Sequence, residues 1–340
     1  MNMLFPSIAA PSVITRSRVT AGSTSALSDW IARSTAPDVE FASDFSGAND
    51  FVLASTNGGH VYAAGMDPTI LGYVVKDLTD GITNGCCLRI DTPAAVGANS
   101  AAWEFPLSSS FTQNSDHFGV GVPFWIQFRF KIPSSRLVLS NCGGEQRGWK
   151  FMNIAQYSPT DTDSQSFSNT HAEHVLQDTN QDGFPQAYNV RDGGNSFVAF
   201  TGFEGGQITL QTAIDRGAGF SGGERYCHYP GGTAACEYFV TDEWMTFMVR
   251  IKPTTYTGTT GNEFTVKYAR WGATEWTTLF HDTEYEIGSP NSQGGGFAGI
   301  NGAHLLTYET NRINSTVDTH QKYDQIIVSL SEIALPAPGA

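Results

Sequence analysis

The sequence predicts an all-β fold, built as a β-sandwich of two antiparallel sheets. Several segments alternate apolar and polar residues with a period of two, as expected where successive side chains of a strand point to opposite faces of a sheet. These short segments are separated by clusters of Gly, Asn, Asp, Ser and Pro, which is typical of sandwiches and barrels. The 340 residues include 36 Gly and 22 Phe, and only 15% are charged, which suits a turn-rich β protein with a sizeable core.

The segment Phe124–Ile132 shows the alternation most clearly. One row of this strand is apolar and is expected to build the core: Phe124, Ile126, Phe128 and Phe130. The opposite row is expected to face outward and to be free to bind a ligand: Trp125, Gln127, Arg129 and Lys131. The segment Trp244–Lys252 repeats this division, with Arg250 and Lys252 in its polar row.

The remaining elements follow in chain order. Residues 1–38 are rich in Ser, Thr, Ala and Pro and are expected to form an N-terminal arm or linker, with one short helix at Ser25–Arg33. The β-sandwich domain is expected at 39–334 and a surface tail at 335–340. Further strands are expected at Val39–Phe45, Ile70–Val75, Cys87–Asp91, Ala101–Pro106, Lys150–Gln156, His174–Gln177, Gln186–Tyr188, Asn262–Arg270, Thr277–Asp282, Ala303–Tyr308 and Tyr323–Leu330.

The charge balance limits the classes of partner. The chain carries 19 Lys and Arg against 33 Asp and Glu, a net charge of −14 at pH 7. Nonspecific binding to nucleic acid or to an anionic membrane needs a positive field, so neither partner is favoured. No segment approaches the roughly 20 apolar residues of a membrane helix, and Met1–Ala10 lacks the features of a classical signal peptide.

Five cysteines cannot all pair within one chain. Cys227 and Cys236 flank a short Pro/Gly segment that a disulfide could close, and we expect this bridge. The disulfide status of Cys86, Cys87 and Cys142 is left open. None of the cysteines has the spacing of a zinc site.

A family resemblance is carried by the segments FWIQFRFKI, GWKFMNIAQY, EHVLQDTNQDGFPQAYN, ERYCHYP, CEYF, DEWMTFMVRIK and KYDQIIVS. Together they resemble bacterial and phage-associated proteins of the concanavalin A-like lectin/glucanase jelly-roll superfamily, which is related to polysaccharide lyases of the heparin-lyase and alginate-lyase type. The resemblance spans about residues 39–330. It implies a jelly-roll sandwich that contacts glycans through a concave face, and it implies no particular catalytic residue.

Polar strand residues form the candidate glycan-binding set. Sugars are bound by planar hydrogen-bonding groups and by aromatic rings that stack on a sugar face. The resemblance would gather such residues on one concave surface: Trp125, Gln127, Arg129, Lys150, Gln177 and Arg250. The alternative is that they are ordinary solvated residues of an outer sheet face.

A lyase is the enzymatic alternative. β-Elimination on a uronic acid needs a group that neutralises the carboxylate, a base and an acid. The candidates for these roles are His174, Tyr188, Lys150, Gln177 and Arg129, with Tyr308 as a further acid or base. The strand motifs of alginate lyases, R-x-E-x-R, Q-x-H and Y-x-K-x-G-x-Y, are absent in that form. The carboxylate motif of jelly-roll glucanases is absent too, which disfavours a retaining glycanase.

A calcium loop is a weaker alternative at Asp178, Asn180 and Asp182, which match the start of a D-x-N-x-D-G motif. The twelfth position is Asn189, which cannot bind in the bidentate manner of Glu. An Asx-rich turn is therefore favoured, and no cofactor is expected.

The sequence thus predicts a jelly-roll protein that contacts a polysaccharide or cell-surface glycan, and two alternatives stay open. One is a uronate lyase, and the other is a purely structural decoration or tail component of a virion. We expect a non-catalytic module displayed on a virion, including that of a phage, or on an extracellular surface. Residues 1–38 are expected to contact other virion subunits.

Overall fold

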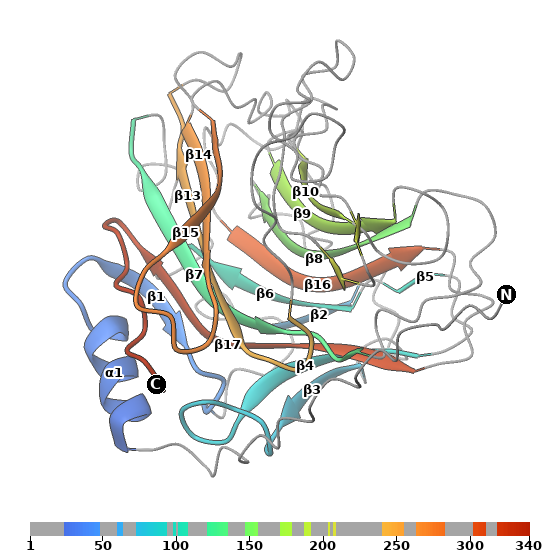
Figure 1. Ribbon diagram of the computed structural model, residues 1–340, viewed down its shortest axis with the longest axis horizontal. Helices are drawn as coiled ribbons and strands as arrows, with labels where there is room; N and C mark the ends of the chain where they lie inside the picture. The colour runs from blue at the N-terminus through green and yellow to red at the C-terminus, as the bar shows by residue number, and fades with distance from the viewer. Residues whose placement is uncertain are drawn as a thin grey trace, which may run out of the picture.

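The computed structural model describes residues 24–47, 60–63, 73–93, 98–99, 101–107, 121–134, 147–155, 171–178, 187–191, 203–204, 207–208, 240–254, 263–282, 302–310 and 318–340. Within these residues the chain is almost entirely strand. Two large antiparallel sheets pack face to face, and one helix lies beside them (Figure 1). This arrangement is the β-sandwich that the alternation of residues predicts, with the jelly-roll form that the family resemblance implies.

The first sheet, called sheet A here, has the strand order β15-β14-β13-β7-β17-β4-β3, with β1 paired to β17. All of its pairings are antiparallel. Its strands are β1 (Val39–Ser43), β3 (Val74–Asp77), β4 (Cys87–Thr92), β7 (Phe124–Lys131), β13 (Met245–Lys252), β14 (Glu263–Ala269), β15 (Thr277–Asp282) and β17 (Thr319–Ser329).

The second sheet, called sheet B here, has the order β10-β9-β8-β16-β6-β2, with β5 paired to β16. Its strands are bent into an arc (Figure 1). They are β2 (His60–Ala63), β5 (Ala98–Asn99), β6 (Ala101–Pro106), β8 (Arg147–Ala155), β9 (His171–Asp178), β10 (Ala187–Arg191) and β16 (Gly302–Thr310). A separate pair is formed by β11 (Phe203–Glu204) and β12 (Gln207–Ile208).

The core between the sheets contains the apolar rows that the sequence predicts. Phe124, Ile126, Phe128 and Phe130 are all fully buried, and the apolar residues of β13 join the same cluster. Phe128 stacks on Phe247 with ring centroids 5.6 Å apart. Sheet B contributes Trp103, Phe105, Met152, Ile154 and Leu305 to this cluster. Burial of these large side chains is the main force that holds the two sheets together.

Several strands differ from the prediction. Strand β17 begins at Thr319, four residues before the predicted Tyr323, because Thr319 and Gln321 are buried in alternation with more exposed neighbours. Strand β2 was not predicted, since His60–Ala63 is short and lies beside glycines. The two-residue strands β5, β11 and β12 were not predicted either. The other observed strands lie within a few residues of the predicted ones.

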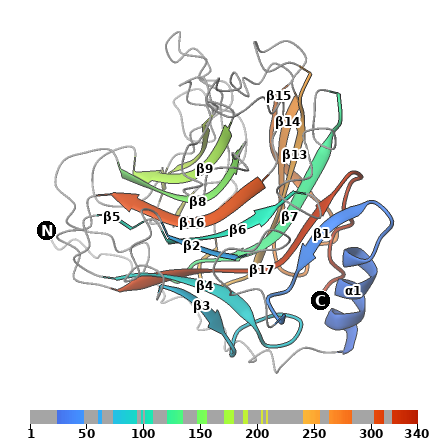
Figure 2. The same cartoon turned by 180° about the vertical axis from the view of Figure 1, so that it is seen from behind.

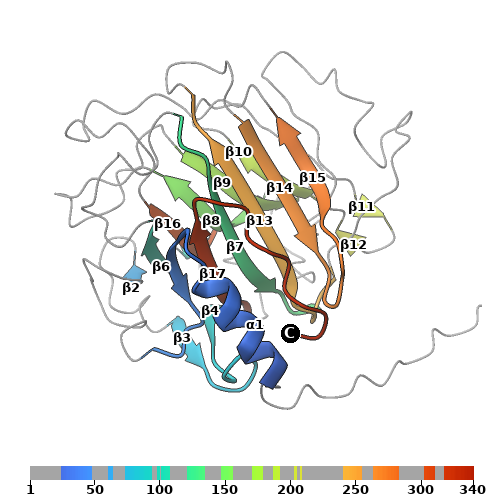
Figure 3. The ribbon, with the colours of Figure 1, turned by 90° about the vertical axis from the view of Figure 1, so that its left-hand side faces the viewer.

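Helix α1 (Thr24–Ser34) matches the helix predicted at Ser25–Arg33. It packs on sheet A through Ala26, Trp30 and Arg33, which recur at the helical spacing and are buried. In Figure 3 both α1 and the C-terminal residues lie over strands of sheet A, and Figure 2 shows the two segments together from behind. This part of the predicted arm is therefore packed on the sandwich. No helix in the described part of the chain is long and apolar enough to span a membrane.

Candidate functional site

The outer face of sheet A, on which the sequence predicts ligand contacts, is covered by other parts of the chain. The covering segments are α1, residues 78–86 and residues 330–340, and together they are called the cover here. Gln127 is 0% exposed and Arg129 is 3% exposed. The prediction that these two residues are free to bind a glycan is therefore wrong, because segments that are remote in sequence bury the polar row of β7.

Buried hydrogen bonds join the polar row of β7 to the cover. Arg33 of α1 donates from Nη1 to Gln127 Oε1 at 2.5 Å and from Nη2 to Gln325 Oε1 at 2.7 Å. Gln127 Nε2 donates to the main-chain oxygen of Ala334 at 3.0 Å. Arg129 Nη2 donates to the main-chain oxygen of Ala340 at 2.6 Å, and its guanidinium lies 5.0 Å from the ring centroid of Trp271. These buried contacts make the row part of the protein interior, although Arg129 Nε has no hydrogen-bond partner in the described part of the chain.

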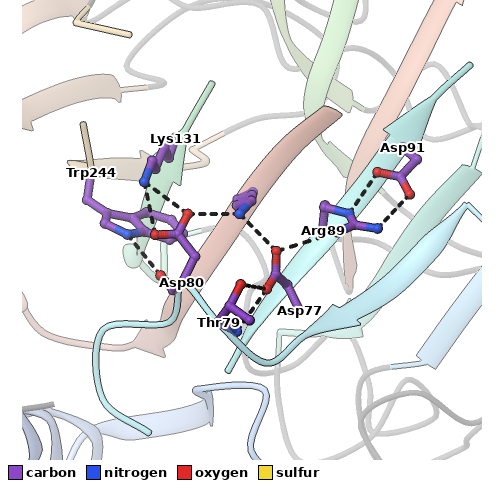
Figure 4. A network of polar contacts seen from close by, with 8 residues as sticks. Asp77, Thr79, Asp80, Arg89, Asp91, Lys131 and Trp244 are labelled. Carbon is purple, nitrogen blue, oxygen red and sulfur yellow. Dashed lines mark hydrogen bonds and ion pairs between the residues drawn. The ribbon is translucent and has the colours of Figure 1, made fainter. Parts of the chain in front are cut away.

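Lys131, the last residue of β7, belongs to a chain of ion pairs beneath residues 78–86 (Figure 4). Its Nζ lies 2.9 Å from Asp80 Oδ2 and 5.7 Å from the ring centroid of Trp244. Lys322 Nζ lies 2.8 Å from both Asp80 Oδ2 and Asp77 Oδ2. The bond from Lys322 and two bonds from Thr79 hold the pKa of Asp77 well below its usual range, although burial alone would raise it. The network fixes the loop to the sheet.

Trp125 and Arg250 keep some exposure on the outer face of sheet A. The Arg250 guanidinium lies 5.4 Å from the ring centroid of Trp125 and forms an ion pair with Glu263. Lys252 Nζ lies 2.6 Å from the same carboxylate, and these two cations lower the pKa of Glu263 to about 2. Trp125 and Arg250 therefore contact each other and Glu263 within sheet A, while both side chains stay partly exposed to solvent.

The predicted glycan-binding set is divided between the two sheets. Gln127, Arg129 and Arg250 lie on strands of sheet A, while Lys150 and Gln177 lie on β8 and β9 of sheet B. The expectation of one shared surface is therefore wrong. The sheets pack through their inner faces, so the outer face of one is remote from the outer face of the other.

Backbone register assigns the sheet B candidates to faces, because directly paired residues of antiparallel strands share a face. Lys150 pairs with Val175, two residues from Gln177, so positions 150 and 177 share one face. The register shifts between Lys150 and Met152, so the period of two does not carry from one of these positions to the other. His174 pairs with Met152, whose side chain lies in the core. Tyr188 pairs with Leu176, two residues from His174, and so falls on the same core-facing side. This placement favours Lys150 and Gln177 over His174 and Tyr188 as residues of an outer-face site.

The outer face of sheet B carries a row of polar positions across five neighbouring strands. His304 of β16 alternates with Ala303 and Leu305, which lie in the core, so its side chain is on the outer face. Its imidazole is nevertheless only 1% exposed. Register continues this row on both sides of His304, through Glu104 of β6, Asn153 of β8, Glu173 of β9 and Arg191 of β10. Further along the same two strands, Tyr308 of β16 pairs with Lys150 of β8.

This row is the candidate functional site. It brings acidic, amide, imidazole and guanidinium residue types to one row of one sheet face, with Lys150, Gln177 and Tyr308 on the same face. Residues of these types can bind sugar hydroxyls and can transfer protons. None of the five residues of the row was among the predicted site residues: Glu104, His304, Asn153, Glu173 and Arg191. The signal for His304 was available, since a single polar residue interrupts the apolar run Ala303–Leu306.

The metal and disulfide predictions fall mainly outside the described residues. Asp178 is the last residue of β9, while Asn180 and Asp182 lie outside them, as do Cys142, Cys227 and Cys236. Among the side chains that the structure describes, no group of three His, Cys, Asp or Glu residues is placed to hold a metal ion. Cys86 and Cys87 are free thiols, and burial raises the pKa of Cys87.

No protein-family model and no curated protein matches the chain. Solved structures with similarity include the PL-14 alginate lyase from Aplysia kurodai, at 8% identity over 85% of this chain and 98% of that one, with a TM-score of 0.45. The alginate lyase Aly36B has 10% identity over 88% of this chain and 99% of that one, with a TM-score of 0.41. Lectin II from Ulex europaeus has 7% identity over 81% and 99%, with a TM-score of 0.34. The strand order of the chain itself defines its fold, a jelly-roll sandwich of two antiparallel sheets.

Proposed function

We propose that the protein binds a polysaccharide along the outer face of sheet B. The observation that carries the proposal is the row of paired positions Glu104, His304, Asn153, Glu173 and Arg191 on the sheet face opposite the hydrophobic core. Residues of these types supply the donors and acceptors that bind sugar hydroxyls. His304 itself is only 1% exposed, so the proposal rests on its neighbours in the row.

The dimensions of the row suit an extended ligand. Neighbouring strands lie roughly 4.8 Å apart, so the five positions from Glu104 to Arg191 extend over roughly 19 Å. A row of this length would offer hydrogen-bonding groups to several consecutive sugar units. A polymer is therefore a better match than a single sugar. The charges of the row nearly balance, since Glu104 and Glu173 stand against Arg191 and the neighbouring Lys150. Neutral and anionic polysaccharides are therefore both compatible with it.

A uronate lyase is the second candidate function, and the pairing of Tyr308 with Lys150 favours it. Tyr308 lies four residues from His304 on the same face of β16. β-Elimination would use one of these groups to remove the proton next to the uronate carboxylate and another to protonate the leaving oxygen. Gln177 or Arg191 would neutralise the carboxylate. The bond from C4 to the glycosidic oxygen would break as a C4–C5 double bond forms.

Binding and cleavage can be tested with one set of proteins. We expect the wild-type protein to bind polymers on a glycan array, and Arg191→Ala and Lys150→Ala to weaken binding at least tenfold. Arg250→Ala changes a cation on the outer face of sheet A and serves as the matched control, which should bind like wild type. Unchanged binding by both sheet B variants, with both folded by circular dichroism, would exclude this face. Release of ultraviolet-absorbing unsaturated product from alginate, glucuronan or heparin would identify a lyase.

The biological setting is a separate part of the proposal. Display on a virion or an extracellular surface, with residues 1–38 contacting other subunits, is supported only by the Ser/Thr-rich composition of that segment. Cross-linking of the protein within a purified virion, with cross-links that map to residues 1–38, would support this setting. A calcium ion at Asp178, Asn180 and Asp182 also remains a proposal, and calcium-dependent thermal stability would support it.

A further inference from the structure

Helix α1 lies beside strand β1 (Figure 2), and a pocket of about 300 Å³ is formed where the helix meets the end of this strand. This volume is at the lower end of the range for sites that bind small molecules. Trp30 and Ser34 of α1 form one wall, and residues of the segment 42–47 form the other. No residue of the sheet B row lines the pocket, so it is a separate feature of the molecule.

Phe45 holds the turn that forms the second wall. Its φ is 57°, a left-handed value that few residues other than glycine adopt. Its ring is fully buried and meets Trp103 of sheet B edge to face, with ring centroids 4.7 Å apart. Burial of the ring offsets the cost of this backbone conformation, and conformations of this kind cluster at functional sites. The two neighbours of Phe45, Asp44 and Ser46, are thereby fixed at the pocket.

The carboxylate of Asp44 is oriented by hydrogen bonds from two segments. Its Oδ1 accepts the main-chain N–H of Ser46 at 3.1 Å and the Ser46 hydroxyl at 2.5 Å. Its Oδ2 accepts Asn84 Nδ2, from the loop of residues 78–86, at 2.7 Å. A carboxylate offers about four lone-pair positions, so Asp44 can accept a further hydroxyl group.

Trp30 gives the first wall an apolar surface and a hydrogen-bond donor. Its side chain is 7% exposed and packs on Met248, Ile327 and Ile333. The indole N–H donates to no group in the described part of the chain. A buried indole N–H usually has a partner, and a ligand in the pocket can supply one. The hydroxyl groups of Ser34 and Ser46 add groups that both donate and accept.

The charges at the pocket favour a neutral ligand. Of the described residues that line it none is basic, and Asp44 would repel a uronate or a phosphate. One cation already lies at the same turn, since Lys76 Nζ donates to the main-chain oxygens of Ser46 at 2.8 Å and of Gly47 at 3.5 Å. A cationic ligand would therefore meet a like charge beside the carboxylate.

We propose that this pocket binds one neutral sugar unit. Sugar hydroxyls would donate to Asp44 and accept from the Trp30 indole N–H, and the C–H groups of the sugar would lie against Trp30 and Ala42. The inference concerns a single sugar unit beside α1 and does not rest on polysaccharide binding at sheet B.

Titration with D-glucose, D-galactose and D-mannose, followed by NMR at the Trp30 indole N–H, tests the site. We expect at least one of these sugars to shift the signal with a Kd on the order of 1 mM, because so small a ligand makes few contacts. The uronate that corresponds to this sugar should bind at least tenfold more weakly, because it brings a second carboxylate toward Asp44.

Ser34→Phe places a ring in the pocket and should weaken binding of the neutral sugar at least tenfold. Ser28→Phe makes the same change at an exposed position of α1 and is the matched control, which should bind like wild type. Asp44→Asn loses the charged acceptor and should weaken binding at least threefold. Lys150→Ala should leave this titration unchanged because Lys150 lies on sheet B, so failure of this site and failure of the sheet B site are distinguishable.

Three results would overturn the inference. The first is a Trp30 signal that none of the three sugars shifts. The second is wild-type affinity in folded Ser34→Phe or, if that variant does not fold, in Asp44→Asn. The third is a uronate that binds as tightly as its neutral counterpart, which would contradict the ligand class.

Discussion

Arg33 and Gln127 are 94 residues apart in the sequence, yet Arg33 Nη1 donates to Gln127 Oε1 at 2.5 Å inside the protein. Because of this contact, the polar row on β7 is part of the protein interior and not an open surface. A row that looks like a ligand-binding surface is instead the layer through which α1 is attached to sheet A. The binding proposal therefore moves to the other sheet, where His304 marks the outer face.

Arg33→Met tests the attachment of α1. The substitution removes the donors to Gln127 and Gln325 and leaves these buried amides without the cation that they bind. We expect the free energy of unfolding to fall by about 3 kcal/mol, measured by urea denaturation. Ser28→Ala, on the exposed side of α1, should change it by less than about 0.5 kcal/mol. Equal stability of the two variants would show that Arg33 does not fasten the helix.

Phe128→Ala tests the core. Phe128 is fully buried and stacks on Phe247, so its truncation leaves a cavity and loses an aromatic contact. We expect a loss of about 3–5 kcal/mol in the free energy of unfolding. Phe128→Leu fills much of the same space and should cost clearly less. A loss near 1 kcal/mol for the alanine variant would contradict the packing described for the core.

Glu263→Gln tests the ion pairs on the outer face of sheet A. Because Arg250 and Lys252 lower the pKa of Glu263 to about 2, its contribution to stability should be present above about pH 4.5 and be lost as the pH falls toward 2. The variant should therefore lose less stability than wild type across that range. Glu332→Gln, a more exposed carboxylate paired with Lys267, is the control. If the free energy of unfolding fell equally with pH in wild type and Glu263→Gln, the ion pairs of Glu263 would not contribute to stability as described.

Gly81→Ala tests how tightly the loop of residues 78–86 is packed. A β-carbon at position 81 would lie 1.8 Å from the main-chain oxygen of Cys86, so the loop backbone must move. We expect a lower midpoint of urea unfolding and faster hydrogen exchange at Ile82, whose N–H bonds Asp324. Leu78→Ala changes a side chain that is 67% exposed and should leave both measurements unchanged. A wild-type midpoint for Gly81→Ala would contradict this close approach.

Local pattern predicts the strands and the core of this protein but not what lies over each sheet. The apolar row from Phe124 to Phe130 is a property of one strand, so a period of two is enough to place it in the core. Burial of Gln127 depends on α1 and on Ala334, which no pattern within β7 can show. The division of Lys150 and Arg250 between two sheets likewise depends on strand order.

The position of β17 between β7 and β4 has a consequence for the order of folding. A chain emerging from the ribosome presents β4 and β7 long before residues 319–329 exist to pair with both. Until then two strands have unpaired edges, and sheet A lacks its centre. Such long-range pairing is slow and leaves open edges that favour aggregation. The protein is therefore expected to complete its fold only after synthesis has passed residue 329, and to depend on chaperones in the interval.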